Sequence, residues 1–238
     1  MGAVTARKEK AAEAGSARPR TRRQRVRMAP DDRERMILEA ATHYFAKHGF
    51  SAQIRELARE LKVSQGLIYR YFSSKQELVD RVYQHTFLRR WDASWEDLLR
   101  DRSLPLRDRL KDFYTLYLGA IDDPDWIRLV MHSGLEGNDL TRRYIRTRVE
   151  HLLGIIAREC RLVPRTAEPD QAEMEMVWHL HSTVIYYLVR KHIFRTATTR
   201  DVPGLVAMII DDFLSGLAGG PGALGKIAIT RRRNGPCP

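Results

Sequence analysis

The sequence has few cysteines and no long apolar run. Two cysteines, Cys160 and Cys237, stand among 238 residues, too few for a disulfide scaffold of this length. The longest apolar stretch, near Leu205–Ile210, is far below the roughly 18 residues of a membrane span. The start of the chain lacks the apolar segment of a secretory signal. We therefore expect a reduced, cytoplasmic protein, with an organellar transit peptide as the alternative interpretation of the arginine-rich start.

Positive charge is concentrated at the two ends of the chain. The net charge is +11. Residues 1–30 hold nine Lys or Arg against two Glu, and residues 219–238 hold four basic residues and no acidic one. These segments account for the whole excess, since residues 31–218 balance at 28 basic and 28 acidic side chains. The pattern indicates a neutral folded body between a disordered basic arm and a flexible basic tail.

The hydropathy pattern is helical throughout the body. Apolar residues recur at helical spacing, and no strand pattern competes with them. Asp31–Glu34 and Ser74–Glu77 have the composition of capping boxes, and Pro105 and Pro124 suit helix starts. We expect about nine helices, at residues 31–48, 54–61, 64–71, 74–99, 105–121, 123–133, 140–163, 170–195 and 201–217. The predicted fold class is all-α.

Residues 54–71 predict a helix, a short turn and a second helix. Leu61 ends the first helix and Ser64 is a favourable N-cap for the second. The connection of three or four residues is typical of a DNA-binding helix-turn-helix, whose second helix lies in the major groove. The residues expected to contact DNA are Arg55, Ser64, Gln65, Gly66, Leu67, Tyr69, Arg70, Tyr71 and Lys75, with Tyr69, Tyr71 and Lys75 on phosphates.

The second helix of this unit has a polar and an apolar side. Gln65 can pair with adenine, Leu67 can contact a thymine methyl group, and Arg70 can pair with guanine. Ile68 and Phe72 point the other way and can pack on the preceding helices. The segment therefore predicts one buried side and one side for DNA.

Residues 33–80 also carry a specific pattern of residue types. The spacing Ser-x-Gly-x-x-Tyr-x-x-Phe-x-x-Lys runs from Ser64 to Lys75. With the flanking residues, it resembles the N-terminal domain of the TetR/AcrR family of transcriptional regulators. Two departures are Lys62, where the family usually has glycine, and Leu67, where threonine is frequent. The loop before Ile54 also lacks the usual Thr or Ser cap. These departures affect the expected base preference rather than the docking mode.

The resemblance implies a domain organisation and a function. Residues 31–76 would form the three-helix DNA-binding domain, and residues 77–218 a larger helical domain for effector binding and dimerisation. The family resemblance implies a homodimer on a near-palindromic operator in double-stranded DNA. A small, largely apolar effector would move the fourth helix and separate the two DNA-binding domains. We expect a repressor rather than an enzyme, with no cofactor.

Large apolar residues mark two further candidate sites in the C-terminal part. The candidate effector pocket comprises Trp95, Trp126, Met131, Tyr144, Trp178 and Tyr186, although such residues are more often ordinary core. The candidate dimer interface comprises Val184, Tyr187, Ile209 and Phe213. The last helix is apolar around most of its circumference, which favours burial on two sides. A core formed within one chain is the alternative.

Other patterns give little support to a different function. His132 and Glu136 are four residues apart, but the glycines between and after them favour a broken helix over a metal site. Gly220–Gly225 matches a nucleotide-binding glycine pattern but follows a helix rather than a strand. No catalytic motif is recognisable. The rival hypotheses are an architectural protein indifferent to DNA sequence and a helical enzyme. The basic residues of Arg18–Arg27 are either a solvated tail or a DNA-backbone contact.

Overall fold

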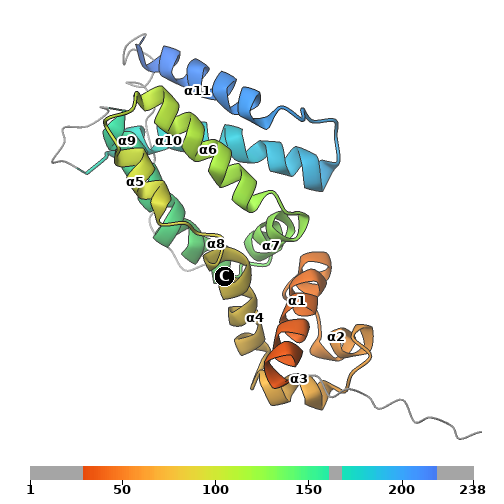
Figure 1. Cartoon of the computed structure of the whole chain (residues 1–238). Helices are drawn as coiled ribbons and strands as arrows, with labels where there is room; N and C mark the ends of the chain where they lie inside the picture. Colours follow the sequence, from red (N-terminus) through yellow and green to blue (C-terminus); the bar gives the residue numbers. More distant parts are fainter. Residues whose placement is uncertain (1–28, 161–167, 219–238) are drawn as a thin grey trace, which may run out of the picture.

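A computed structural model describes residues 29–160 and 168–218, and all regular elements in these ranges are helices (Figure 1). The α-helices are α1 (Pro30–His48), α2 (Ile54–Glu60), α3 (Gln65–Tyr71), α4 (Lys75–Tyr83), α5 (Ser94–Arg100), α6 (Leu106–Ile121), α7 (Pro124–Leu135), α8 (Asp139–Tyr144), α9 (Glu150–Glu159), α10 (Gln171–Leu188) and α11 (Val202–Ala218). Three π-helical segments, Gln84–Leu88, Ile145–Val149 and Val189–Phe194, continue α4, α8 and α10. The predicted all-α class is confirmed.

Helices α1–α3 form a small N-terminal unit, which we call the head, at one end of the molecule (Figure 1). Its core is made by side chains that are almost fully buried, including Ile37 and Phe45 of α1, Leu57 of α2 and Ile68 of α3. Their helical spacing puts them on the inner faces of three short helices. The sequence pattern predicted this packing.

The remaining helices form the body, and α4 joins it to the head (Figure 1). Helix α4 packs on α1 at one end and passes into the π-helical segment at the other. Helices α5, α6 and α9 pack together, and α11 packs on α6 and α10. None of the described helices is both long and apolar enough to cross a membrane.

The prediction of one long helix at residues 74–99 is wrong, because the helix is interrupted between Leu88 and Ser94. Arg90 stabilises the break: its guanidinium donates to the Ala120 carbonyl oxygen at 2.9 Å and to the Asp123 carboxylate at 2.8 Å. Both acceptors lie at or next to the turn between α6 and α7, so this turn holds the Arg90 side chain in place. These distant partners explain why helical periodicity alone did not reveal the break.

The predicted capping box at Asp31–Glu34 is also wrong. Helix α1 begins one residue earlier, with Pro30 at its first position, and has no side-chain cap. Glu34 instead forms an ion pair with Arg81 of α4. The carboxylate therefore joins the head to α4 rather than closing the start of α1.

The second predicted box, at Ser74, is half formed. The Ser74 hydroxyl oxygen accepts from the Glu77 backbone at 3.0 Å, but the Glu77 carboxylate accepts from Ser73 instead of Ser74. A full capping box occurs at Asp170 and Glu173, where α10 begins as expected.

Several predicted segments extend past the described residues. The helix expected at 140–163 is present as α8, a π-helical segment and α9, and its expected end past Cys160 lies outside the described part of the chain. The basic arm at Arg18–Arg27 and the tail at 219–238 also lie outside it.

Candidate nucleic-acid interface and internal cavity

The turn between α2 and α3 is short and tightly bonded. The backbone N–H of Lys62 donates to the Arg59 carbonyl oxygen at 3.1 Å, and that of Val63 donates to Ala58 at 3.0 Å. Lys62 has a φ of 54°, in the left-handed region, which costs a non-glycine residue about 1 kcal/mol. Lysine thus adopts the conformation for which glycine is usual at this position of the resembled family.

Ser64 starts α3 as predicted. Its hydroxyl oxygen accepts from the Leu67 backbone N–H at 3.1 Å and satisfies one of the free donors of the first turn. Ile68 and Phe72 are each 1 % exposed and fix the helix against the core of the head. The cap and these two buried side chains determine which side of α3 faces solvent.

The outward side of α3 is polar and accessible. Gln65, Gly66, Tyr69 and Arg70 are exposed, while Leu67, Tyr71 and Lys75 are half-buried and Ser64 is exposed at the cap. A Cβ atom added to Gly66 would meet nothing within 4 Å. The start of α3 therefore has an unobstructed surface that another molecule can approach closely.

Two further residues expected to contact DNA are basic and lie on the neighbouring helices α2 and α4. Arg55 is exposed in the first turn of α2, with its Nε atom 3.5 Å from the Glu56 carboxylate. Lys75 lies in the first turn of α4. Hydrogen bonds from the Ser73 side chain and backbone lower the pKa of Glu77, so this carboxylate holds the α3–α4 corner in its charged form. Of the nine residues expected to contact DNA, seven lie on α3 or at its N-cap, whereas Arg55 and Lys75 lie in the first turns of α2 and α4.

The head is attached to the body mainly through α7. The Ser51 backbone N–H donates to the Glu136 carboxylate at 2.9 Å, and His43 Nδ1 lies 3.0 Å from the Asp125 carboxylate. Gly49 has a φ of 81°, and the Glu136 carboxylate occupies the space that a Cβ atom would need. Glycine at this position therefore permits both the backbone turn and the close approach of α7.

The body contains an apolar cavity of about 220 Å³ between α6, α7, α8 and α10. Four of the predicted effector residues line it, namely Trp126, Tyr144, Trp178 and Tyr186. The other two do not. Trp95 is buried next to Tyr117, with 5.3 Å between the two ring centroids. Met131 packs against the hydrophobic core.

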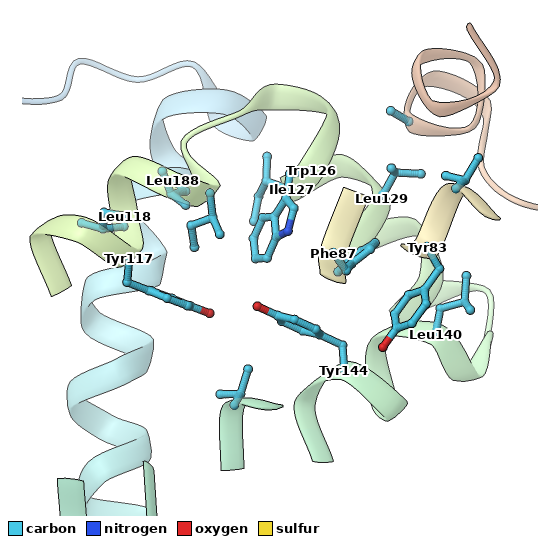
Figure 2. Close-up of a cluster of buried hydrophobic side chains, with 14 of the residues drawn as sticks. Tyr83, Phe87, Tyr117, Leu118, Trp126, Ile127, Leu129, Leu140, Tyr144 and Leu188 are labelled. Atoms are coloured by element: carbon cyan, nitrogen blue, oxygen red, sulfur yellow. The ribbon is translucent and has the colours of Figure 1, made fainter. Parts of the chain in front are cut away.

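Sequence reasoning missed the other residues of the cavity wall, among them Tyr117 and His181. Tyr117 comes from α6, and its hydroxyl points towards that of Tyr144 below Trp126 (Figure 2). Burial raises the pKa of Tyr144 to about 12 and lowers the pKa of His181 to about 4. Both side chains are therefore neutral at physiological pH. His181 belongs to an apolar stripe of α10, but the sequence did not show that this stripe meets α6.

An aromatic contact connects the cavity wall to α4. Phe87, in the π-helical continuation of α4, lies 5.8 Å from Trp126 and 5.3 Å from Tyr144 between ring centroids (Figure 2). Tyr83 of α4 lies 5.3 Å from Phe87. A change at Trp126 or Tyr144 can thus reach α4 through direct ring packing.

A second hollow, of about 720 Å³, lies between α10 and α11. Ile209 and Phe213 line it, and Met208 beside them is 55 % exposed. Val184 and Tyr187 are instead 0 % and 6 % exposed inside the protomer. These two residues were wrongly assigned to a dimer surface, because their side of α10 packs within its own chain.

The candidate metal pair His132 and Glu136 does not form part of a metal cluster. The His132 Nδ1 atom is 3.7 Å from the Glu136 carboxylate, and that carboxylate bonds to Ser51 of the head. No group of three or more potential ligands occurs in residues 29–160 and 168–218.

Residues 37–82, which span most of the head and α4, match the family model for bacterial regulatory proteins of the tetR family. A helix-turn-helix transcriptional repressor of Mycobacterium tuberculosis is 39% identical over 69 residues, covering 29% of this chain and 37% of the repressor. The regulator YhgD of Bacillus subtilis is 34% identical over 80 residues, covering 33% of this chain and 41% of YhgD. The chain thus spans about two fifths of the length of these curated relatives.

The similarity to solved structures extends over the body. A TetR-like transcriptional regulator from Rhodococcus sp. RHA1 matches with a TM-score of 0.61 at 19% identity, covering 82% of this chain and all of that one. This likeness shows the two-part helical fold. The head defines a helix-turn-helix protein. Residues 37–82 are thus similar to the tetR family of bacterial regulatory proteins.

Proposed function

We propose that the protein is a DNA-binding transcriptional regulator that binds a near-palindromic operator as a homodimer and is released by a small molecule. The observation that carries this proposal is the exposed start of α3, held by the Ser64 cap and by buried Ile68 and Phe72. A helix fixed in this way can enter the major groove with its first residues at base edges. The curated relatives, which are named as transcriptional regulators, support the same function.

The exposed side chains have the chemistry for two kinds of contact. Gln65 and Arg70 suit the edges of adenine and guanine, respectively. Tyr69, Lys75 and Arg55 surround them and suit phosphates, which position a protein without selecting sequence. The open space above Gly66 lets the helix start approach the duplex. Such an arrangement favours sequence-selective binding over the architectural alternative.

The hollow between α10 and α11 supports dimerisation. Ile209 and Phe213 are half-buried there, and Met208 is exposed although it is apolar. A two-fold axis through this face would bring the same patch of a second copy against it, as isologous dimers require. Two heads then lie on one side of the pair and match a palindromic site.

Release by a small molecule follows from the position of the cavity. Trp126 of α7 lies in its wall and contacts Phe87 next to α4, while Glu136, directly after α7, contacts the head. A ligand that moves α7 therefore changes two attachments of the head. We infer that effector and operator exclude one another, and that the protein represses transcription, as the name of the mycobacterial relative says of that protein. We propose that a regulator of this kind works in the cytoplasm.

The direct test is selection of protein-bound fragments from random DNA duplexes. The molecular mass of the protein–DNA complex is then measured. We expect enrichment of a near-palindromic sequence bound by two chains. Phe213→Arg should give single chains that bind the same site weakly, whereas Arg142→Ala, an exposed change far from the hollow, should leave the dimer intact. Absence of any enriched sequence would favour the architectural alternative and contradict the proposal. Catalytic turnover that survives deletion of residues 1–75 would favour an enzyme.

A further inference from the structure

We propose that the cavity in the body selects an uncharged, hydroxyl-bearing molecule of about two fused rings. This inference rests on the proposed function, since it names the chemical class of the effector. Three independent features of the cavity support it: its volume, the absence of charge from its wall, and two buried polar atoms that have no hydrogen-bond partner in the part of the chain that the structure describes.

The volume sets the size of the ligand. An apolar cavity of about 150 Å³ holds one benzene molecule. The cavity here has about 220 Å³, and its walls include aromatic rings from α6, α7, α8 and α10. Figure 2 shows three of them, Tyr117, Trp126 and Tyr144. A two-ring molecule of naphthalene size fits this space, and flat rings such as Trp126 and Tyr144 pack well against another aromatic ring. Longer or more branched molecules need rearrangement of the walls.

The wall determines the charge of the ligand. None of the residues that line the cavity is Asp, Glu, Lys or Arg. His181 is neutral at physiological pH because burial lowers its pKa to about 4, and burial raises the pKa of Tyr117 and Tyr144. A carboxylate or an ammonium group in this space would have no counter-charge, and burying an unpaired ion is expensive. The cavity therefore discriminates against ions.

Two buried polar atoms beside the cavity favour a hydroxyl group on the ligand, because a small shift of the wall that exposes either atom would give it a partner. The Trp126 Nε1 and His181 Nδ1 atoms are buried without a hydrogen-bond partner among the described residues, and both residues line the cavity. The Trp126 indole only donates, whereas a neutral histidine offers one donor and one acceptor. A hydroxyl group both donates and accepts, so it can satisfy either atom. Unpaired buried polar groups are costly, which gives a hydroxyl-bearing ligand an advantage over a hydrocarbon.

The ligand can enter from the surface of α10. Tyr186 lines the cavity and is 53 % exposed, and Ser182, one turn earlier, is exposed and also lines it. The cavity wall is therefore continuous with the molecular surface at these two side chains. A bulky residue in place of Ser182 can occupy the entrance without disturbing the buried core.

The test measures binding of three probes to the full chain by isothermal titration calorimetry and equilibrium dialysis. The probes are 2-naphthol, naphthalene and naphthalene-2-carboxylate, which share one ring system. We expect 2-naphthol to bind at one site per chain, about fivefold to tenfold more tightly than naphthalene, as one hydrogen bond predicts. We expect no measurable binding of the carboxylate. Equal or tighter binding of the carboxylate would overturn the inference.

Variants locate the site and the hydrogen bonds. The double variant Trp126→Phe/His181→Phe should bind naphthalene and 2-naphthol within about twofold of each other, whereas Trp95→Phe, a change at an equally buried tryptophan outside the cavity, should keep the preference. Ser182→Trp should abolish binding of both probes, and Gln171→Trp, at an exposed position of the same helix, should not. An unchanged preference in the double variant would overturn the assignment of the hydroxyl partners.

Operator binding is measured in the same preparations. If the selected operator is bound and none of the three probes binds, the ligand class is wrong while the regulatory function stands. If no operator can be selected but 2-naphthol binds with the expected preference, the cavity assignment stands and the proposed regulatory function fails. The two proposals can therefore fail separately.

Discussion

The head and the cavity of the body are built in different ways. Apart from Arg55, the surface proposed to contact DNA comes from one continuous segment, residues 64–75, which near neighbours in sequence hold in place. The cavity gathers Tyr117, Trp126, Tyr144 and Trp178 from separate helices. A local capping pattern can specify the first arrangement, whereas the second depends on how long helices pack.

This difference has an energetic side. In the head, buried Ile68 and Phe72 stabilise the fold, and their exposed neighbours are available for binding. In the cavity, the same residues form the wall and the binding surface. Trp126, for example, contacts Phe87 on one side and lines the cavity. Stability and binding should therefore separate cleanly in the head and less cleanly in the cavity.

The largest effect is expected from a cavity made inside the head. Phe72→Ala removes a ring that is 1 % exposed and should lower the free energy of unfolding by about 3–5 kcal/mol. Denaturant unfolding followed by circular dichroism measures the change. Tyr69→Ala, at an exposed ring on the other side of α3, should stay within about 0.5 kcal/mol of the parent while weakening operator binding. Equal losses of stability would show that the two sides of α3 do not have separate roles.

The next largest effect concerns the cavity and pH. The folded-state pKa of His181 is about 4, below its ordinary 6.5, so the unfolded chain binds a proton first as the pH falls. The fold should lose stability between about pH 6.5 and pH 4, by up to about 3 kcal/mol from this group. Denaturant unfolding of the parent and of His181→Phe across this range isolates the contribution. Parallel curves for the two proteins would contradict burial of a neutral His181.

A smaller effect is expected at one base contact. Arg70→Ala should cost about 1–3 kcal/mol of operator binding and relax selectivity at one base pair, with little change in stability. Fluorescence anisotropy on the selected operator and on its single-base variants measures both quantities. Arg142→Ala serves as the control, since this arginine is exposed on the body. If Arg70→Ala instead weakens binding to all DNA sequences equally, Arg70 contacts a phosphate rather than a base.

The smallest of these effects is expected at Gly66. A Cβ atom there meets nothing within 4 Å, and alanine is favoured over glycine inside a helix by about 0.5–1 kcal/mol. Gly66→Ala should therefore raise the midpoint of thermal unfolding. On the operator the added methyl group should lower affinity, because it stands where the helix approaches the duplex. A more stable protein with unchanged operator affinity would place the DNA contact elsewhere on α3.

Much of the head could be predicted from sequence, because its signals are local. The Ser64 cap, the apolar spacing to Ile68 and Phe72, and the end of α1 at Gly49 all act within a few residues. The unusual residue was Lys62, whose left-handed backbone the sequence left open. The predicted start of α1 failed because Glu34 pairs with Arg81, a partner far along the chain.

The cavity could be predicted only in part, because its signals are not local. Aromatic residues identified Trp126 and Tyr144, but the same criterion also selected Trp95, which is ordinary core. His181 was missed, since only packing against α6 turns an apolar stripe of α10 into a cavity wall. Val184 was assigned to a dimer surface because periodicity shows that a side is apolar without showing what covers it.

The most direct test of the central claim, that the exposed side of α3 selects a DNA sequence, is a competition measurement. The full chain is bound to its selected operator at about 150 mM salt, where nonspecific electrostatic binding is weakened. A scrambled duplex of equal length and composition then competes. The account predicts that the operator binds at least about a thousandfold more tightly and that Arg70→Ala narrows this ratio. Equal affinity for the two duplexes would contradict it.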